Sequence, residues 1–469
     1  MPANHLQHDH TALRDLLLQT LDLAYDYLSG IAERPSAALH EPAETLPLPD
    51  EGLGAAAALV RFAERYAPHM AANNGGRYLG FVTGGTTPAA IMGDWLVSAY
   101  DTNVANNGTS VAPYLERETI RLLCSLFGLP DAFSGVFVTG ATISNMVGLA
   151  LGREWAAQQQ GRNVTANGLY GMTPTSVISG EPHSSIFKAL SMLGMGRSSV
   201  IRAAQQPERE AVVVEDIRVR LAALNGTPAI VVANGGTVNT VDFDDIKGIA
   251  ALKTEFPFWL HVDAAFGGFA ACSPHYASRL EGWELADSIT VDAHKWLNVP
   301  YDAAMIFTPH RDLQLQVFQN SAAYLGEISD PPDFFHLTPE NSRRFRALPA
   351  WFTLMAYGRA GYQRIVEENC AAATSLAAEI ERSDGFRLLA PARMNVVCFT
   401  LADTAGAPTK AVVGAFLGRL AAGGRAFLTP TTYQGIAGMR AAFSNWRTTL
   451  SDVAIVWEAL QRSLRDVSE

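Results

Sequence analysis

The chain has 469 residues, which is enough for a large core and for two or three lobes. With 48% hydrophobic and 17% charged residues, its composition is typical of a compact globular protein and excludes a mainly disordered chain. The formal net charge is −11 and no dense run of Lys or Arg occurs, so binding of nucleic acid through a basic surface is not expected.

Residues 1–82 are expected to form a helical N-terminal segment. Apolar residues follow a helical period over residues 11–34, prolines then interrupt the pattern, and a second helix is predicted near Gly54–Arg65. This segment is too thin to hold a core of its own, so its apolar stripe is expected to pack on a partner subunit. The first residues lack a secretory pattern and no apolar stretch is long enough for a bilayer, so a cytoplasmic location without membrane contact is expected.

Residues 83–345 are predicted to form a large α/β domain. Helices alternate there with short β-rich runs, several of which are continuous Val, Ile and Phe runs rather than alternating ones. Such runs indicate strands covered on both faces, as in a mostly parallel sheet wrapped by helices. The predicted strands are Gly135–Thr139, Ser176–Ser179, Ser199–Ala203, Ala229–Ala233, Trp259–Val262, Ser288–Val291 and Ala303–Phe307.

Residues 346–469 are predicted to form a smaller α+β domain, entered through a helix over Arg343–Glu381. Before it, Gln319–Asn341 contains few periodic apolar positions and is interpreted as a long loop; loops of that length in compact domains are commonly functional. The smaller domain is predicted to contain strands Val396–Leu401, Ala426–Thr429 and Met439–Ser444, and helices Thr409–Ala422 and Asp452–Arg465.

Lys295 is the residue with the strongest chemical signal. It follows the predicted strand Ser288–Val291, its flanks are short and apolar, and a histidine rather than another charge precedes it. A partly desolvated amine at a strand end can lose its proton and form a Schiff base with an aldehyde, as in enzymes that use pyridoxal phosphate (PLP). The four cysteines are far apart and form no CxxC pair, so neither a metal site nor a disulfide framework is predicted.

Two further segments end predicted strands and suit such a cofactor. Gly140, Ala141 and Thr142 form a small-residue turn that opens a helix, where free N–H groups and the helix dipole favour a phosphate; an ordinary capped turn explains the pattern equally well. Asp263 ends an apolar strand, where an unpaired carboxylate is costly to bury and a protonated pyridine nitrogen would satisfy it. Its alternative role is a helix N-cap. The small Ala265 beneath would let a flat ring lie close.

His183 and Thr237 also follow predicted strands. The imidazole of His183 could stack on a cofactor ring and later move a proton, although a lone histidine is more often structural. The hydroxyl of Thr237, in a glycine-rich turn, could bind the cofactor or the substrate carboxylate, and a plain turn is the alternative. No dinucleotide-binding, P-loop, HExxH or GxSxG signature occurs in these segments, so the common competing cofactor and hydrolase motifs are missing.

Together these segments resemble the group II PLP-dependent amino acid decarboxylases, which include aromatic amino acid, glutamate, cysteine sulfinate and diaminobutyrate decarboxylases. The resemblance extends from about residue 76 to residue 450 and rests on order and spacing. It implies PLP fold-type I (aspartate aminotransferase-like), with a central mostly parallel seven-stranded sheet, a smaller C-terminal α+β domain, and a homodimer with active sites at its interface. The residues that carry it are Thr139-Gly140-Ala141-Thr142, His183, Asp263-Ala264-Ala265 and Asp292-Ala293-His294-Lys295-Trp296.

The resemblance also implies roles for individual residues. Lys295 would carry the cofactor, Asp263 would face its pyridine nitrogen, and His183 would stack on its ring. Ala141, Thr142, Asp292 and His294 would lie near the phosphate, although Asp292 stands where the family often has asparagine.

Substrate and product depend on other positions. Arg440 matches an arginine that meets the substrate carboxylate in glutamate decarboxylases, and the segment that contains Phe81 and Asn103 normally shapes the substrate pocket. Because this segment is poor in aromatic residues and rich in amides, a polar or small L-amino acid is slightly favoured for α-decarboxylation to the amine and CO2.

The family's loop tyrosine, which protonates the substrate carbon, has no clear counterpart in this chain. An ungapped count places Phe334 at its position, and Tyr324 is the alternative, as the one tyrosine of the loop. Decarboxylation with oxidative deamination to an aldehyde, or a carbon–carbon lyase reaction on the same fold, is therefore the alternative activity.

Overall fold

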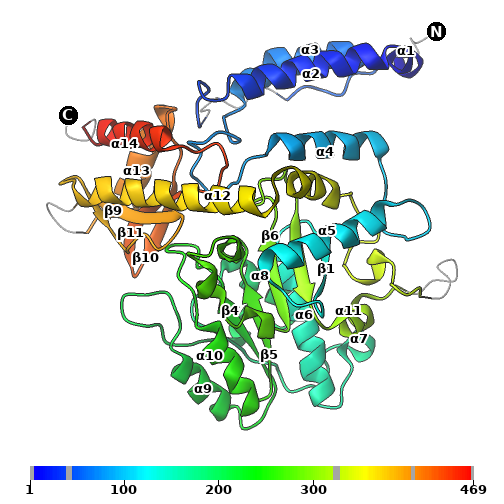
Figure 1. Ribbon diagram of the computed structural model, residues 1–469, viewed down its shortest axis with the longest axis vertical. Coiled ribbons are helices and arrows are strands. Elements are labelled where there is room, and N and C mark those ends of the chain that lie inside the picture. The colour runs from blue at the N-terminus through cyan, green and yellow to red at the C-terminus, as the bar shows by residue number, and fades with distance from the viewer. Residues whose placement is uncertain (1–4, 38–44, 321–327, 403–406, 466–469) are drawn as a thin grey trace.

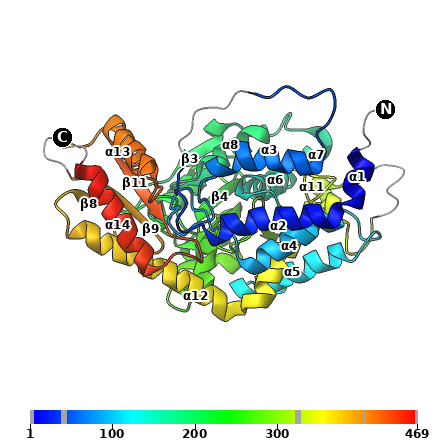
Figure 2. The same cartoon turned by 90° about the horizontal axis from the view of Figure 1, so that it is seen from above.

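The computed structural model describes residues 5–37, 45–320, 328–402 and 407–465 (Figure 1). Three helices, α1 (His5–Thr11), α2 (Leu13–Ser29) and α3 (Ala55–Arg65), form the N-terminal segment. Figures 1 and 2 show them beside one another, above α4 (Pro88–Tyr100) and apart from the central sheet. None of the three buries a residue within the chain, as expected for a segment without its own core.

The large domain is an α/β layer structure around a seven-stranded sheet of order β1-β7-β6-β5-β4-β2-β3. The sheet is mostly parallel, and only β7 is antiparallel to its neighbours β1 and β6. The predicted mostly parallel sheet is therefore confirmed. Its strands are β1 (Ser134–Val138), β2 (Val177–Ser179), β3 (Val200–Arg202), β4 (Ala229–Asn234), β5 (Phe258–Asp263), β6 (Ser288–Asp292) and β7 (Ala304–Thr308).

Helices cover both faces of this sheet. β4, β5 and β6 are buried along their whole length, which explains why their sequences are continuous apolar runs. The helices of the large domain after α4 are α5 (Ala112–Phe127), α6 (Ala141–Gln159), α7 (Val164–Asn167), α8 (Ser184–Met192), α9 (Val214–Ala223), α10 (Ile246–Ala251) and α11 (Arg311–Phe318).

The C-terminal domain contains a separate four-stranded sheet of order β10-β11-β9-β8 with its own core. Helix α12 (Ala347–Glu381) runs from α4 and α5 of the large domain to this sheet. The other elements are β8 (Phe386–Leu388), β9 (Val396–Leu401), α13 (Lys410–Ala422), β10 (Thr429–Tyr433), β11 (Ile436–Ala442) and α14 (Leu450–Arg465). The chain before α4 also contributes to the core of the C-terminal domain, because Leu79 lies in this core and its N–H donates to the Phe427 carbonyl.

Two predicted boundaries in this region were wrong. The strand predicted at Ala426–Thr429 begins only at Thr429, where its pairing with β11 starts. Gln434 and Gly435 both have positive φ and form the two-residue hairpin turn that fixes the register of β10 and β11. Pro430 is accommodated because β10 is an edge strand. The helix predicted from Arg343 begins at Ala347, because Arg343 is held outside the helix by a buried ion pair with Glu116.

No helix within the described ranges is long and apolar enough to cross a membrane.

Candidate active site

A cavity of about 400 Å³ lies where β4, β5 and β6 end. Because these strands are parallel, their carboxyl ends meet at one edge of the sheet, where ligands of such folds bind. The loops that follow the strands bring together six of the predicted residues, which come from positions more than 250 residues apart. These are His183, Thr237, Asp263, Ala265, Lys295 and Arg440.

Lys295 projects into this cavity from the turn after β6. Its Nζ lies 2.8 Å from Oδ2 of Asp292, the last residue of β6, and 5.6 Å from the centre of the Phe266 ring. The backbone of Gly84 packs against the Lys295 carbonyl so closely that a Cβ there would lie 1.5 Å from the oxygen. Gly84 is therefore required to be glycine for steric reasons, and it fixes the turn that carries the amine.

Asp292 connects the amine to the predicted phosphate turn. Its Oδ1 accepts the backbone N–H of Ala141, the first residue of α6, at 2.7 Å. His294 lies on the same side, with Nε2 3.6 Å from Oδ1 of Asp292, and burial lowers the pKa of its imidazole. Gly140 and Thr142 flank Ala141 at this helix start, and the N-cap residue Gly140 has no side chain to cap α6. The turn thus offers N–H groups to an anion, with Asp292 as the present acceptor.

Asp263 and His183 are held by neighbours in the walls of the cavity. Oδ2 of Asp263 accepts from Nδ2 of Asn145 at 2.9 Å, and Oδ1 accepts from the Ala265 N–H at 3.2 Å. His183 is the N-cap of α8, and its Nδ1 lies 2.8 Å from Oγ of Ser185. Burial lowers the pKa of His183, and the negative charge of Asp263 opposes this shift.

This set of side chains fits PLP. The Lys295 amine suits the aldehyde of the cofactor, and the buried Asp263 carboxylate has acceptor capacity left for the ring nitrogen. The small Ala265 suits the ring face, and the N-terminus of the 19-residue helix α6 suits the phosphate. The fit has one unfavourable element, because the Asp292 carboxylate occupies the Ala141 N–H and would repel a phosphate.

Arg440 and Thr237 lie in the wall formed by β11 and the loop after β4. Arg440 donates from Nη1 to the Val238 carbonyl, its Nε is buried without a hydrogen-bond partner among the described residues, and burial lowers its pKa. The hydroxyl of Thr237 donates to Oε2 of Glu210. Glu210 also accepts from Asn239 and Thr240, so it holds the whole loop in place. The guanidinium of Arg440 therefore retains donors for an anionic ligand.

The structure does not place the other predicted residues in this cavity. Phe81 is 62% exposed, and Asn103 accepts from the backbone N–H of Arg343. Phe334 is buried with its ring 4.7 Å from the guanidinium carbons of both Arg117 and Arg343. None of the three lines the cavity of the single chain. Tyr324 lies outside the described residues.

Sequence reasoning missed the residues that support the site from behind, above all Asn145, Ser185 and His261. All three are buried and connected by hydrogen bonds to one another or to Asp263. One signal was available, because His261 is a polar residue inside the apolar run of β5, where a buried polar group needs partners. Asn145 carries no such signal, since asparagine in a helix reveals nothing of its neighbours across the fold.

Comparison with known proteins identifies the family of this chain. Residues 74–402 match the family described as the pyridoxal-dependent decarboxylase conserved domain. An aromatic-L-amino-acid decarboxylase of Bacillus atrophaeus is 24% identical over 99% of this chain and 98% of its own length. An L-2,4-diaminobutyrate decarboxylase of Rhizobium meliloti is 27% identical over 97% of this chain and 92% of its own. The crystal structure of Oryza sativa TDC with PLP and tryptamine superposes with a TM-score of 0.89 at 22% identity, covering 98% and 99% of the two chains.

The family match spans well over half of the chain, and the cavity is lined by the predicted lysine and aspartate, Lys295 and Asp263. The chain belongs to the pyridoxal-dependent decarboxylases and is a carboxy-lyase with pyridoxal 5′-phosphate as its cofactor.

Proposed function

We propose that this enzyme removes the α-carboxylate of a polar or small L-amino acid as CO2 and releases the corresponding amine. The observation that carries the proposal is the joint presence of Lys295, Asp263 and Arg440 in one cavity of about 400 Å³. A cationic side chain opposite the cofactor lysine suits a substrate that bears a carboxylate.

The side chains divide the work of the reaction. PLP, when bound, supplies the electron sink that accepts the electron pair left by CO2. Lys295 would hold the cofactor through its amine. Asp263 would face the ring nitrogen, and its carboxylate is held in place by hydrogen bonds from Asn145 and the Ala265 N–H. His183 faces the same space and can move a proton to the substrate carbon.

The walls of the cavity support a polar substrate. They include the polar residues Glu181, Asn239, Thr431 and Arg440, and two phenylalanines, Phe187 and Phe266. The two curated relatives named above act on aromatic amino acids and on diaminobutyrate, so at 24–27% identity their names do not agree on one side chain. The polar lining therefore carries the substrate proposal.

Replacement of Lys295 by alanine tests the activity. We expect Lys295→Ala to lose both CO2 release and the visible absorption band of the lysine-bound cofactor. A variant that retained both would contradict the proposal.

A panel of acidic, small, basic and aromatic L-amino acids, assayed for CO2 release, tests the substrate class. Arg440→Leu should reduce activity most on acidic substrates.

Aldehyde formation is the second candidate. It is favoured by Phe334, the ungapped counterpart of the loop tyrosine, which has no hydroxyl and is buried away from the cavity. Without a phenol to protonate the substrate carbon, oxygen can intercept it. Measurement of CO2, hydrogen peroxide and amine in one reaction distinguishes the two, because peroxide equal in amount to CO2 would overturn simple decarboxylation.

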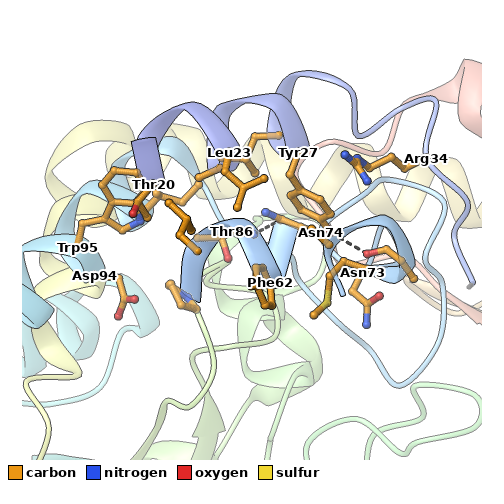
Figure 3. Close-up of a pocket in the computed structure, with 18 residues that line it drawn as sticks. Thr20, Leu23, Tyr27, Arg34, Phe62, Asn73, Asn74, Thr86, Asp94 and Trp95 are labelled. Atoms are coloured by element: carbon orange, nitrogen blue, oxygen red, sulfur yellow. Dashed lines mark hydrogen bonds between the residues drawn. The ribbon is translucent and has the colours of Figure 1, made fainter. Parts of the chain in front are cut away.

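We also propose that the enzyme works as a homodimer with active sites at the interface. Helices α2 and α3 bury nothing within the chain, and a cavity of about 610 Å³ separates them from α4 (Figure 3). Leu23 and Tyr27 of α2, Phe62 of α3 and Trp95 of α4 line this cavity. A second copy of the chain would cover the apolar faces that are left open.

A further inference from the structure

Asn145 connects the side chains of Asp263 and Ser185 behind the cofactor cavity. It lies in α6 and is fully buried. Its amide nitrogen donates to Oδ2 of Asp263 at 2.9 Å and to Oγ of Ser185 at 3.0 Å. Its amide oxygen lies 2.9 Å from Nε2 of His261. Both N–H groups of one amide are therefore used, one toward Asp263 and one toward the start of α8.

The orientation of this amide follows from its partners. The carboxylate of Asp263 only accepts hydrogen bonds, so the amide nitrogen must face it; the reverse orientation would place two oxygens against each other. The amide oxygen then faces His261, whose Nε2 must carry a hydrogen.

The other side of the His261 ring agrees with this assignment. Its Nδ1 lies 2.8 Å from Oγ of Ser288, and that oxygen accepts from Nε1 of Trp259, which can only donate. The hydroxyl hydrogen of Ser288 is thus free to point at Nδ1 of a neutral His261. Burial lowers the pKa of His261 to about 4, which keeps the ring neutral near pH 7. The direction of every hydrogen bond from Trp259 to Asp263 is therefore determined.

The same logic extends to His183. Oγ of Ser185 accepts from Asn145, so its own hydrogen can point at Nδ1 of His183, 2.8 Å away. The backbone N–H of Ser185 also donates to this Nδ1, at 3.3 Å. With two donors aimed at it, Nδ1 is an acceptor, and the hydrogen of neutral His183 is on Nε2. His183 lines the cavity with Nδ1 turned to Ser185, so Nε2 is the nitrogen left for a ligand.

We propose that Asn145 is a positioning residue that fixes the neutral tautomer of His183 through Ser185 and fixes the orientation of the Asp263 carboxylate. The charged groups that face His183 are Asp263, Asp292, Lys295 and Arg440, and none of them forms a hydrogen bond to its Nδ1. If the proposed decarboxylation holds, the Nε2–H of neutral His183 is directed toward the substrate as a hydrogen-bond donor, and Nε2 cannot accept a proton there.

Nitrogen NMR on cofactor-free protein labelled in the histidine rings tests the tautomer directly. The His183 signals are identified by their loss in His183→Gln. We expect the Nε2–H form near pH 8 in the wild type, and a larger share of the Nδ1–H form in Asn145→Leu and Ser185→Ala. Ser185→Thr keeps a hydroxyl and should restore the Nε2–H form. An Nδ1–H form in the wild type, or an unchanged tautomer in Ser185→Ala, would overturn the proposal.

Kinetics on the cofactor-loaded enzyme separate positioning from general stability. Ser185→Ala should lower kcat at least tenfold with little change in KM, because the hydrogen-bond donor that His183 presents to the reacting group is altered while the substrate contacts remain. The control is Asn395→Leu, which removes a buried amide of the C-terminal domain that donates to the Phe443 carbonyl at 2.7 Å. It should reduce stability but leave kcat unchanged, and an equal loss in both variants would contradict a positioning role. The NMR result does not depend on the reaction, so it stands or fails separately from the proposed function.

Discussion

At the residue scale, the carboxylate of Asp292 is expected to oppose binding of the cofactor phosphate. Its carboxylate accepts the Ala141 N–H at 2.7 Å and pairs with Lys295 at 2.8 Å, so it stands between the amine and the phosphate turn. A phosphate bound at this turn would meet a negative charge in a buried place, where repulsion is screened little.

We expect Asp292→Asn to bind PLP more tightly, with a Kd lower by about tenfold, equivalent to about 1.4 kcal/mol. Titration of the cofactor-free protein measures this, and pyridoxal, which lacks the phosphate, is the control ligand. The gain should be much smaller for pyridoxal, because the removed charge acts on the phosphate. An equal gain for both ligands would show that Asp292 acts on the amine instead.

The buried His261 predicts how stability depends on pH. Its pKa is about 4 in the folded chain and about 6.5 when unfolded, so the unfolded state binds a proton first as the pH falls. Stability is full above about pH 6.5 and is lost toward pH 4, by on the order of 3 kcal/mol over the whole window. In chemical denaturation, His261→Gln should lose this part of the pH dependence. His8→Gln, at an exposed position, should retain it, and parallel curves for all three proteins would contradict the assignment.

At the scale of elements, one buried ion pair holds the segment after residue 328 against the large domain. Arg343 and Glu116 are both fully buried, with Nη2 and Oε1 2.6 Å apart. The guanidinium also donates to the carbonyls of Val104 and Phe137, and Glu116 accepts the Phe137 N–H. The pair therefore joins α5, β1 and the segment before α12, which explains why that helix starts at Ala347 and not at Arg343.

Arg343→Met should lower the free energy of unfolding by about 3–5 kcal/mol, because it leaves the Glu116 carboxylate buried and unpaired. Glu116→Gln in the same chain should recover part of this loss, since the remaining partner is then neutral. Arg382→Met is the matched control, because Arg382 pairs with Glu379 at an exposed site, where such pairs contribute about 0–1 kcal/mol. Similar losses at the two sites, measured by urea denaturation, would contradict the account.

At the scale of the whole molecule, the exposed apolar residues of the N-terminal helices predict that two copies of the chain form a dimer. Leu17 and Leu21 lie one turn apart on α2, are 61% and 42% exposed, and do not line the cavity above α4, whereas Leu23 and Tyr27 do. Apolar side chains that the chain itself leaves uncovered need a second surface to cover them.

We expect sedimentation to show a dimer for the wild type and a monomer, or a much weaker dimer, for the double variant Leu17→Glu/Leu21→Glu. Leu450→Glu is the control, since Leu450 is equally exposed (61%) but lies at the start of α14 in the C-terminal domain. A monomeric wild type, or a dimer unaffected by the double variant, would contradict the proposed interface.

The sequence by itself determined the fold class and the cofactor. Continuous apolar runs predict doubly covered strands, and the order and spacing of His183, Asp263 and Lys295 indicate a PLP enzyme, because strand ends and the residues after them can be recognised locally. Parallel strands then bring those ends to one edge, so the reacting groups come together without further information.

Only the tertiary structure decided which residues support these groups and which do not reach them. Asn145 became visible through hydrogen bonds to residues 40, 116 and 118 positions away, and no local pattern encodes such contacts. Phe334, which matches the loop tyrosine by ungapped count, is held between Arg117 and Arg343 instead of lining the cavity. Local chemistry can be read from neighbouring residues, whereas the partners of a buried polar group depend on packing between elements distant in the chain.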